Sequence, residues 1–490
     1  MEEQFSVRLE KLKKLAELGV TPYPYRFAGA QRFAAIIAAH KEQDAEALKG
    51  ADVKVRGAGR ILSIRSMGKS VFMHLFDGEE KLQVYVRKDI VSEKDFAVND
   101  LLDIGDIIGV QGTVFRTRTG ELSILVQELT FLAKSLHPLP EKWHGLQDKE
   151  LRFRQRYLDL IVNPDAQEIF RKRSRLIQSL RRFFHERGFV EVETPMMHSI
   201  PGGAAARPFV THHNALDIDL YLRVAPELYL KRLLVGGMEK VFEINRNFRN
   251  EGISLMHNPE FTMVEFYELY RDAGDFMDLS EQLLLDLAAE LLVDNTLEWQ
   301  GHRIALAPPF RRVKFMEAIA QASGLTLEQL WDEAAVRAHI ATRFAEEALP
   351  PTFGKMLELL FDAYVEKTLI EPTFVTGYPK IISPLSKVSR MDARETERFE
   401  LYVAGMEIAN GFSELNDPLE QRRRFEEQAR DRERGDDEAQ RIDNGFLQAL
   451  EHGMAPAAGE GIGIDRLVML FTGAASIKEV ILFPLLRPRE

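Results

Sequence analysis

The spacing of hydrophobic positions changes along this chain. Leucines between residues 9 and 18 recur at helical spacing among lysines and glutamates, and a second apolar stripe follows at residues 33–40. From residue 53 to 132 hydrophobic and polar positions alternate, which is the period of β-strands. Further on, helical and alternating stretches are mixed: we expect a strand at residues 189–193 and helices at residues 310–370, the last of them at Gly354–Leu369. We therefore expect, in chain order, an N-terminal helical segment, a β-domain, an irregular Pro-bearing linker and a larger mixed domain: 1–50, 51–135, 136–150 and 151–490.

The β-domain has the pattern of a small barrel. A short helix near residues 92–101 lies between its third and fourth strands, an order typical of OB-folds, whose second and third strands bind oligonucleotides. Aromatic, Gln, His and Arg side chains share the outward faces of those strands, and Phe72 and Gln83 are candidate base contacts. The alternative is a face packed against another domain. The predicted strands are Val53–Ile64, Ser70–Phe76, Lys81–Val86, Asp106–Arg116 and Leu122–Leu132.

Composition narrows the class of protein. A chain of 490 residues is too long for a single core. It has no cysteine, which excludes disulfides, thiolate zinc sites and cysteine nucleophiles. No apolar run has membrane-spanning length and no apolar leader opens the chain, so we expect a cytoplasmic protein with no membrane partner. The net charge of −12 means that a nucleic acid would have to be bound by local basic patches.

Candidate chemistry gathers between residues 223 and 270. The pattern predicts a short helix, a strand, a loop at residues 247–259 and a second strand that places Glu265 and Tyr267 on one face. Arg249 and Glu251 lie at the turn, and His257 follows. An arginine fork binds carboxylate or phosphate oxygens, although most Arg–Glu pairs are surface ion pairs. Polar side chains on the adjoining strand favour a ligand here.

Two later stretches add oxygen and cation groups. Residues 399–414 form a predicted hairpin with Glu400 on one arm and Glu407 on the other. Facing carboxylates repel one another, so either they bind Mg²⁺ with phosphates or Lys and Arg neighbours neutralise them; the residues alone do not decide. Farther along, a Gly-rich strand leads into a helix that Arg466 opens, a suitable position for binding polyphosphate.

These stretches resemble known signatures. Phe248-Arg249-Asn250-Glu251, followed by His257 and Phe261, resembles the second motif of class II aminoacyl-tRNA synthetases, and residues 225–261 resemble the lysyl-tRNA synthetase branch. The helix at residues 167–187 with its following strand and Pro195 is similar to the first motif, and residues 459–466 to the third. The resemblance implies an α+β protein, in which an N-terminal OB-fold barrel precedes an antiparallel-sheet catalytic domain with flanking helices, and a homodimer.

The resemblance also implies a reaction and its residues. Lysine and ATP would form lysyl-adenylate, and lysine would then pass to the 3′ end of tRNA(Lys), whose U-rich anticodon Phe72 and Gln83 would contact. Glu400 and Glu407 would hold Mg²⁺. The catalytic and ATP-binding residues would be Arg249, Glu251, His257, Phe261 and Arg466. The lysine-binding residues would be Gly203, Glu227, Arg249, Glu265, Tyr267, Asn410 and Glu414.

Two alternatives remain. An aspartyl- or asparaginyl-tRNA synthetase shares this architecture, but a pocket with Glu265 and Glu414 is wrong for aspartate. A synthetase-like binding protein that had lost catalysis would be expected to lack Arg249, Arg466 or the paired glutamates, and all of them are present.

Overall fold

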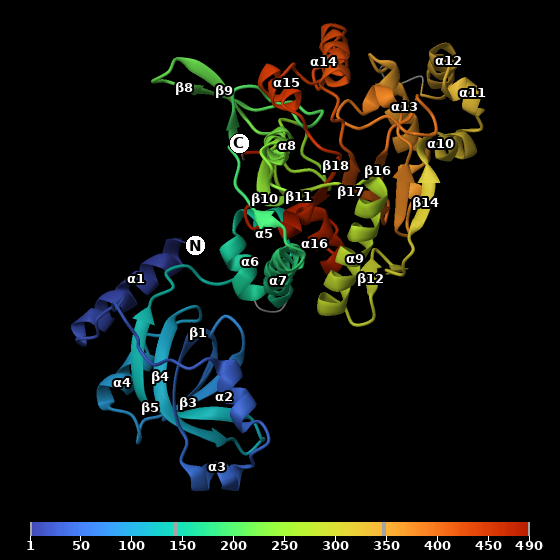
Figure 1. Cartoon of the computed structure of the whole chain (residues 1–490). Helices are drawn as coiled ribbons and strands as arrows, with labels where there is room; N and C mark the ends of the chain where they lie inside the picture. The colour runs from blue at the N-terminus through green and yellow to red at the C-terminus, as the bar shows by residue number, and fades with distance from the viewer. Residues whose placement is uncertain (1, 141–145, 345–348, 489–490) are drawn as a thin grey trace. The chain divides into compact units, whose positions relative to one another are not determined.

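The computed structural model describes residues 2–140, 146–344 and 349–488, in two compact units, Met1–Asn163 and Pro164–Glu490 (Figure 1). The predicted linker at residues 136–150 lies partly outside the described residues. None of the described helices combines the length and apolar character needed to cross a membrane.

Unit 1 is built on a closed five-stranded barrel in the order β1-β2-β3-β5-β4. Its interior holds the apolar positions of β2 and β3, including Met73 and Val84, because alternation turns them inward. The helix α4 (Glu93–Asn99), capped by Ser92, lies between β3 and β4, so the predicted OB-fold is confirmed. The strands are β1 (Lys54–Met67), β2 (Ser70–Phe76), β3 (Lys81–Arg87), β4 (Ile107–Arg116) and β5 (Leu122–Ala133).

The N-terminal helices pack on the barrel core. Leu15 and Phe33 are buried there, which confirms the helical spacing in this segment. The first helix ends just before Gly19, whose φ of +66° glycine adopts easily. The helices of unit 1 besides α4 are α1 (Glu2–Glu17), α2 (Phe33–His40), α3 (Ala45–Ala51), α5 (Lys149–Arg154) and α6 (Arg156–Val162).

Unit 2 contains an eight-stranded sheet in the order β14-β15-β16-β17-β18-β11-β10-β6. Its pairs are antiparallel except β14 with β15 and β6 with β10, so the predicted antiparallel architecture is confirmed. The strands are β6 (Val190–Glu191), β10 (Lys240–Phe248), β11 (Glu260–Leu269), β14 (Arg311–Lys314), β15 (Thr373–Thr376), β16 (Arg398–Val403), β17 (Met406–Ser413) and β18 (Ala457–Gly463).

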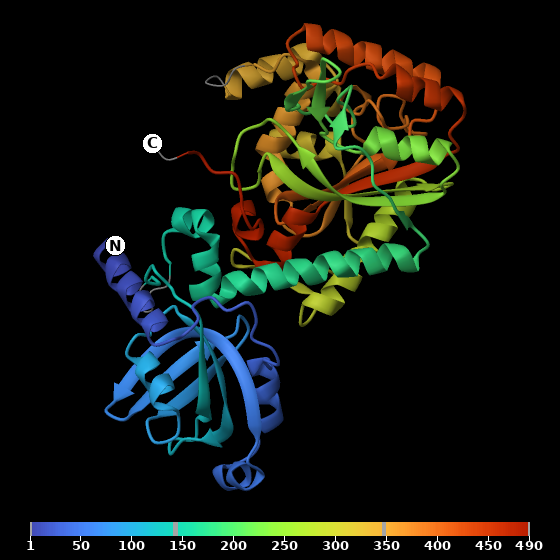
Figure 2. The ribbon, with the colours of Figure 1, turned by 90° about the vertical axis from the view of Figure 1, so that its left-hand side faces the viewer.

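Helices cover the sheet unequally. One face packs against α7 (Pro164–Glu186), α9 (Ala273–Leu291) and α16 (Ile464–Thr472), and this layer holds the largest apolar core (Figures 1 and 2). The other face carries α8 (Glu227–Val235) and α15 (Asn444–Glu451) at one end. The rest of that face is left open for a cavity.

Smaller elements complete unit 2. A helical layer with its own apolar core adjoins β15 and β16. Its helices are α10 (Phe315–Ser323), α11 (Leu327–Leu330), α12 (Glu333–Arg343) and α13 (Phe353–Tyr364). The remaining elements are β7 (Met197–His198), β8 (Val210–His213), β9 (Ile218–Leu222), β12 (Thr296–Trp299), β13 (His302–Ala305), α14 (Pro418–Glu433), α17 (Ile477–Val480) and the 3₁₀ turns η1 (Glu366–Thr368) and η2 (Lys380–Ile382).

Three details differ from the sequence expectations. The strand expected at residues 189–193 keeps only β6, because just two of its residues pair with β10. The section at residues 310–370, expected to be helical, begins with β14, which pairs in parallel with β15. The last helix there, expected to reach Leu369, ends at Tyr364 and is followed by η1.

Candidate active site

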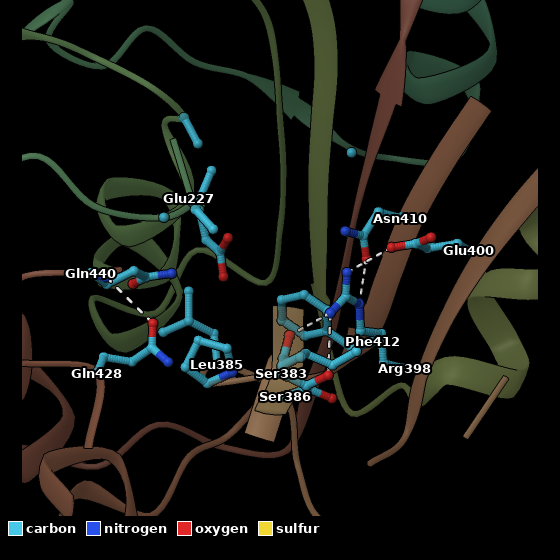
Figure 3. Close-up of a pocket in the computed structure, with 18 of the residues that line it drawn as sticks. Glu227, Ser383, Leu385, Ser386, Arg398, Glu400, Asn410, Phe412, Gln428 and Gln440 are labelled. Carbon is cyan, nitrogen blue, oxygen red and sulfur yellow. Dashed lines mark hydrogen bonds and ion pairs between the residues drawn. The ribbon is translucent and has the colours of Figure 1, made fainter. Parts of the chain in front are cut away.

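A cavity of about 320 Å³ opens on the sheet face that carries α8 (Figure 3). Glu227 points into it from α8, and Arg398, Glu400 and Asn410 lie on the other side, from β16 and β17. Glu265 and Tyr267 of β11 line it as well, whereas the alternate residues of β11 lie in the core on the opposite face. The predicted alternation of this strand is therefore confirmed.

Three buried carboxyl groups gather at this cavity. Glu227, Glu265 and Glu414 are each less than a tenth exposed, and the Tyr267 hydroxyl donates to Glu265 Oε2 at 3.2 Å. Burial, together with the negative charge of Glu227, raises the pKa of Glu265 to about 8. Burial likewise raises the pKa values of Glu227 and Glu414. A site of this kind stabilises bound cations, because an ammonium restores the ionised form of each carboxyl.

Glu414 lies behind the cavity wall. Its Oε2 contacts the Lys231 ammonium at 2.5 Å, an ion pair without good hydrogen-bond angles, and its Oε1 has no hydrogen-bond partner in the described chain. A Cβ at Gly459 would clash with both Tyr267 and Glu414 Oε1, so glycine is what allows these two side chains to come together. The structure thus brings Glu414 beside Tyr267, as the lysine-site expectation requires.

Gly203 lies directly against Glu227. Its φ is +93°, and a Cβ would come within 3.0 Å of the Glu227 Cβ. A side chain here would strain the backbone and move Glu227. Both residues line the cavity.

Glu400 and Glu407 line the same cavity but are not direct partners across the hairpin. The register pairs Glu400 with Asn410 and Glu407 with Tyr402, because the hairpin turns between Val403 and Met406, and a bulge at Leu401 and Tyr402 adds to the offset. The expectation that the two carboxylates face one another is wrong in this respect.

Each of these carboxylates also has an arginine neighbour. Arg398 donates to Glu400 Oε1 at 2.6 Å and to Asn410 Oδ1 at 3.2 Å (Figure 3). The hydroxyls of Tyr378 and Tyr402 donate to Glu400 Oε2 at 2.7 and 2.6 Å. Glu407 accepts from Arg466 at 3.2 Å. The sequence left two possibilities, Mg²⁺ binding or neutralisation by Lys and Arg neighbours. In the structure, arginine side chains pair with both carboxylates.

The donor set is compatible with Mg²⁺ carried on a nucleotide. No group of three or more His, Cys, Asp or Glu side chains among the described residues is arranged to hold a metal by itself. Two carboxylates, with Glu407 39% exposed on its side chain, match the usual mode in which Mg²⁺ takes one or two carboxylates and completes its shell with phosphates and water.

A second cavity of about 100 Å³ adjoins the first and shares Arg249 and Met263 with it. All five residues expected at ATP line it: Arg249, Glu251, His257, Phe261 and Arg466. The Arg249 guanidinium lies 5.0 Å from the Phe261 ring centre, and its buried Nε has no hydrogen-bond partner in the described chain. A buried donor of this kind favours an anionic ligand.

His257 and Arg466 meet across this cavity. Arg466 Nη2 lies 3.1 Å from His257 Nε2, and His257 Nδ1 lies 2.9 Å from the Ser254 hydroxyl. Burial and the positive charge of Arg466 lower the pKa of His257. The neutral ring then accepts from Arg466 through Nε2 and donates to Ser254 through Nδ1.

The candidate base-binding residues lie on the barrel of unit 1. Phe72 is stacked on Tyr85 at 4.1 Å between ring centres. Gln83, expected on an outward face, is instead buried, because its amide donates to Glu121 at 2.8 Å and accepts from Ser123 at 2.9 Å. The stacked rings and the Glu121–Gln83 pair form one mixed aromatic and polar surface, which suits unpaired bases.

Several residues of these sites were not predicted. Lys231 could have been found from its position four residues after Glu227 on the predicted helix, the spacing of a helical ion pair. Arg398 lies two residues before Glu400, so alternation places both side chains on the same face of the strand, and this spacing could have identified Arg398. Glu121 gave none, since it enters the site from a turn far along the chain.

Comparison with known proteins gives two family matches. Residues 148–487 match the family described as tRNA synthetases class II (D, K and N), and residues 55–132 match the OB-fold nucleic acid binding domain. Curated relatives resemble the chain over nearly its whole length. Lysine–tRNA ligase of Pelotomaculum thermopropionicum is 52% identical, over 100% of this chain and 96% of that protein. The corresponding enzymes of Moorella thermoacetica and Bacillus subtilis are 53% and 48% identical, over 99% and 100% of this chain and 98% of each protein.

Proposed function

Since this chain belongs to the lysine–tRNA ligases of the class II aminoacyl-tRNA synthetases, we propose that its two cavities and its barrel divide one reaction among them. The chain activates L-lysine with ATP to lysyl-adenylate and transfers lysine to the 3′ end of tRNA(Lys). The larger cavity binds lysine, the adjoining one binds ATP, and the barrel binds the anticodon. This tRNA charging serves translation in the cytoplasm.

The buried carboxyl groups are the observation that carries the assignment of the amino acid. Glu265, Tyr267 and Glu414 receive the ε-ammonium of lysine, and Glu227 receives the α-ammonium beside Gly203. Desolvating an ammonium is costly unless carboxylates replace its water, so a neutral or anionic side chain gains nothing here. Asparagine or aspartate would leave buried carboxylates unpaired. The pocket therefore disfavours the sibling synthetases.

Activation needs placement rather than a protein nucleophile. The lysine carboxylate, near Asn410, attacks the α-phosphorus in line and pyrophosphate leaves. Arg249 lines both cavities, so its guanidinium bridges the carboxylate and the α-phosphate. The adenine stacks on Phe261 and is contacted by Glu251.

The outer phosphates are held by His257 and Arg466. Glu400 and Glu407 would hold Mg²⁺, which neutralises phosphate charge when bound. Arg398 and Arg466 pair with these carboxylates and offset part of their negative charge.

In the barrel, Phe72 and Tyr85 offer rings for stacking, and Gln83 with Glu121 offers hydrogen bonds to base edges. These are the groups that recognise unpaired bases such as those of an anticodon. A binding protein without catalysis would need only this surface. The intact set of cationic and acidic groups in unit 2 favours the enzyme.

A homodimer is supported by an exposed apolar groove in unit 2. It has a volume of about 590 Å³ and is lined by Phe209, Leu222 and the C-terminal residues 481–485, of which Phe483 is 73% exposed. An apolar surface of this kind marks an interaction site. Sedimentation of the purified chain checks this: a mass twice 56.0 kDa is expected, and a monomer at micromolar concentration would contradict it.

Charging assays test the proposed function directly. The chain is incubated with ATP and radiolabelled lysine, asparagine or aspartate, together with tRNA(Lys) or tRNA(Asp). Acid-precipitable label is expected only with lysine and tRNA(Lys). Charging of tRNA(Asp) with aspartate or asparagine would contradict the assignment of the pocket.

A further inference from the structure

A buried lysine of the protein itself joins two of the carboxylates assigned to substrate. Lys231 Nζ is fully buried and lies 2.6 Å from Glu227 Oε1 and 2.5 Å from Glu414 Oε2. The ring of Phe412 lies 5.0 Å from the same ammonium. Glu227 and Lys231 are one helical turn apart on α8, whereas Glu414 follows β17, so this ammonium ties the helix to the sheet.

Without the Lys231 ammonium, the buried carboxylates around it would outnumber the cations near them. Glu227, Glu265 and Glu414 are buried together with Tyr267, and Arg398 faces Glu227 from β16. Buried carboxylates that lack a cation take up protons instead of staying charged. Lys231 stays charged, because the attraction of Glu227 and Glu414 outweighs burial and raises its pKa.

Each of the two carboxylates keeps an oxygen for another partner. Glu227 lines the cavity, and the ion pair with Lys231 involves its Oε1. Glu414 Oε1 is buried beside Tyr267 and has no hydrogen-bond partner in the described part of the chain. Lys231 is not among the cavity-lining residues, so it would not touch the substrate.

We propose that Lys231 is a positioning residue for lysine binding: it fixes Glu227 and Glu414 and opposes the protonation that burial favours, so that their other oxygens receive the two ammonium groups of the substrate. This inference rests on the proposed roles of Glu227 and Glu414. Without the Lys231 ammonium, Glu227 or Glu414 holds one more proton. When the substrate ammonium binds, that carboxyl loses its proton to solvent and becomes a carboxylate.

Calorimetry of lysine binding near pH 7, in two buffers of different ionisation enthalpy, counts the protons released. Lys231→Met keeps an unbranched side chain one atom shorter and removes its charge. We expect it to bind lysine at least about tenfold more weakly and to release up to about one proton more than the unaltered protein, because one pKa unit corresponds to a tenfold change. Lys231→Arg keeps a cation and should retain the original proton count.

Lys240→Met is the matched control. Lys240 pairs with the buried Glu268 at 2.9 Å on the same sheet but outside the cavity, so its loss should change neither the affinity nor the proton count. Weaker binding by Lys231→Met with an unchanged proton count would mean that Lys231 only packs, and would overturn the inference. Lysine binding by Lys231→Met with unchanged affinity would also overturn the inference.

Two further measurements separate the possible failures. If Lys231→Met does not fold, as its melting curve would show, Lys231→Arg decides, and a changed proton count in that variant overturns the inference. Glu227→Gln tests the underlying assignment: if it binds lysine as tightly as the unaltered protein, the proposed site of the α-ammonium is wrong, whatever Lys231 does.

Discussion

Single side chains in the lysine cavity carry charge that an ordinary core would exclude. Glu227, Glu265 and Glu414 are buried at the edge of one cavity, and Lys231 is the cation in direct contact with two of them. Burying carboxylates costs several kcal/mol each, about enough to offset much of a domain's net stability. This cost is what the proposed function accounts for, since it assigns to these carboxylates a substrate with two ammonium groups.

Arg249 is predicted to be indispensable for adenylate formation. Arg249→Ala removes the group that lines both cavities, so ATP–pyrophosphate exchange should fall to background while the melting temperature is nearly unchanged. Arg303→Ala is the matched control, because Arg303 is an exposed residue on β13 that pairs with Asp294 and lines neither cavity. Near-normal exchange by a folded Arg249→Ala protein would rule out its role.

Glu414→Gln should weaken lysine binding selectively. It keeps the shape of the side chain and removes one charge, and a hydrogen bond to a charged group contributes about 1.5–3 kcal/mol. The KM for lysine should rise about tenfold to a hundredfold or more, and the KM for ATP far less. Glu281→Gln, at a buried glutamate of α9 that accepts from the Phe310 amide at 2.9 Å and lines neither cavity, should leave both unchanged. An equal loss for both substrates would sink the assignment.

The raised pKa of Glu265, about 8, predicts the pH dependence of lysine binding. Below that pH the empty site holds a proton that must leave before the carboxylate can receive an ammonium. Affinity should therefore increase from pH 6 to pH 8, by at most about tenfold per unit, and level off above. The KM for lysine measured across this range checks the slope, which Glu265→Gln should flatten.

The same pKa shift has an opposite effect on stability. Because the folded carboxyl keeps its proton where the unfolded one has lost it, its contribution to stability is full at low pH and declines as pH rises from about 4.5 to about 8. Glu265→Gln should accordingly raise the melting temperature at pH 8 while impairing lysine activation. A lower melting temperature would contradict the burial argument.

Residue identities in the site were predictable where a local pattern marked them. Glu265 and Tyr267 follow from alternation on one strand, and Arg249 from its turn. Contacts between side chains far apart in the sequence were not predictable. Glu414 contacts Lys231, and Glu121 contacts Gln83, only through tertiary folding. The expected facing of Glu400 and Glu407 failed for a local reason, since the residue pattern did not fix where the hairpin turns, which is between Val403 and Met406.

Whole strands and helices were easier to predict than their ends. The barrel strands β2 and β3 and the helix α8 lie where periodicity placed them, because each has one clean buried face. β14 was missed, since a four-residue strand of sequence RRVK has no apolar alternation and depends on pairing with β15.

The barrel strands carry a prediction of their own. Replacing Phe72 and Gln83 together by Ala removes one stacking ring and one hydrogen-bonding amide from β2 and β3, and stacking contributes about 1–3 kcal/mol per base. Charging of tRNA(Lys) should weaken, whereas lysine activation measured without tRNA should be nearly unaffected. Unchanged charging of an unmodified transcript would show that this face does not bind the anticodon.

In the whole molecule, two units with separate cores hold the two kinds of recognition. The barrel core in unit 1 supports the stacking face, and the largest core of unit 2 supports the sheet below the cavities. Under the proposed function, activation depends on unit 2 and tRNA selection draws on unit 1. The central claim is that the buried carboxylates of unit 2 select lysine.

ATP–pyrophosphate exchange with each of the twenty amino acids, without tRNA, tests that claim most directly. The proposed function predicts exchange with lysine and at most background with the others, because lysine supplies a second ammonium for the buried carboxylates. Exchange driven by aspartate, asparagine or any neutral amino acid at a rate comparable to lysine would contradict it, and so would the absence of exchange with lysine.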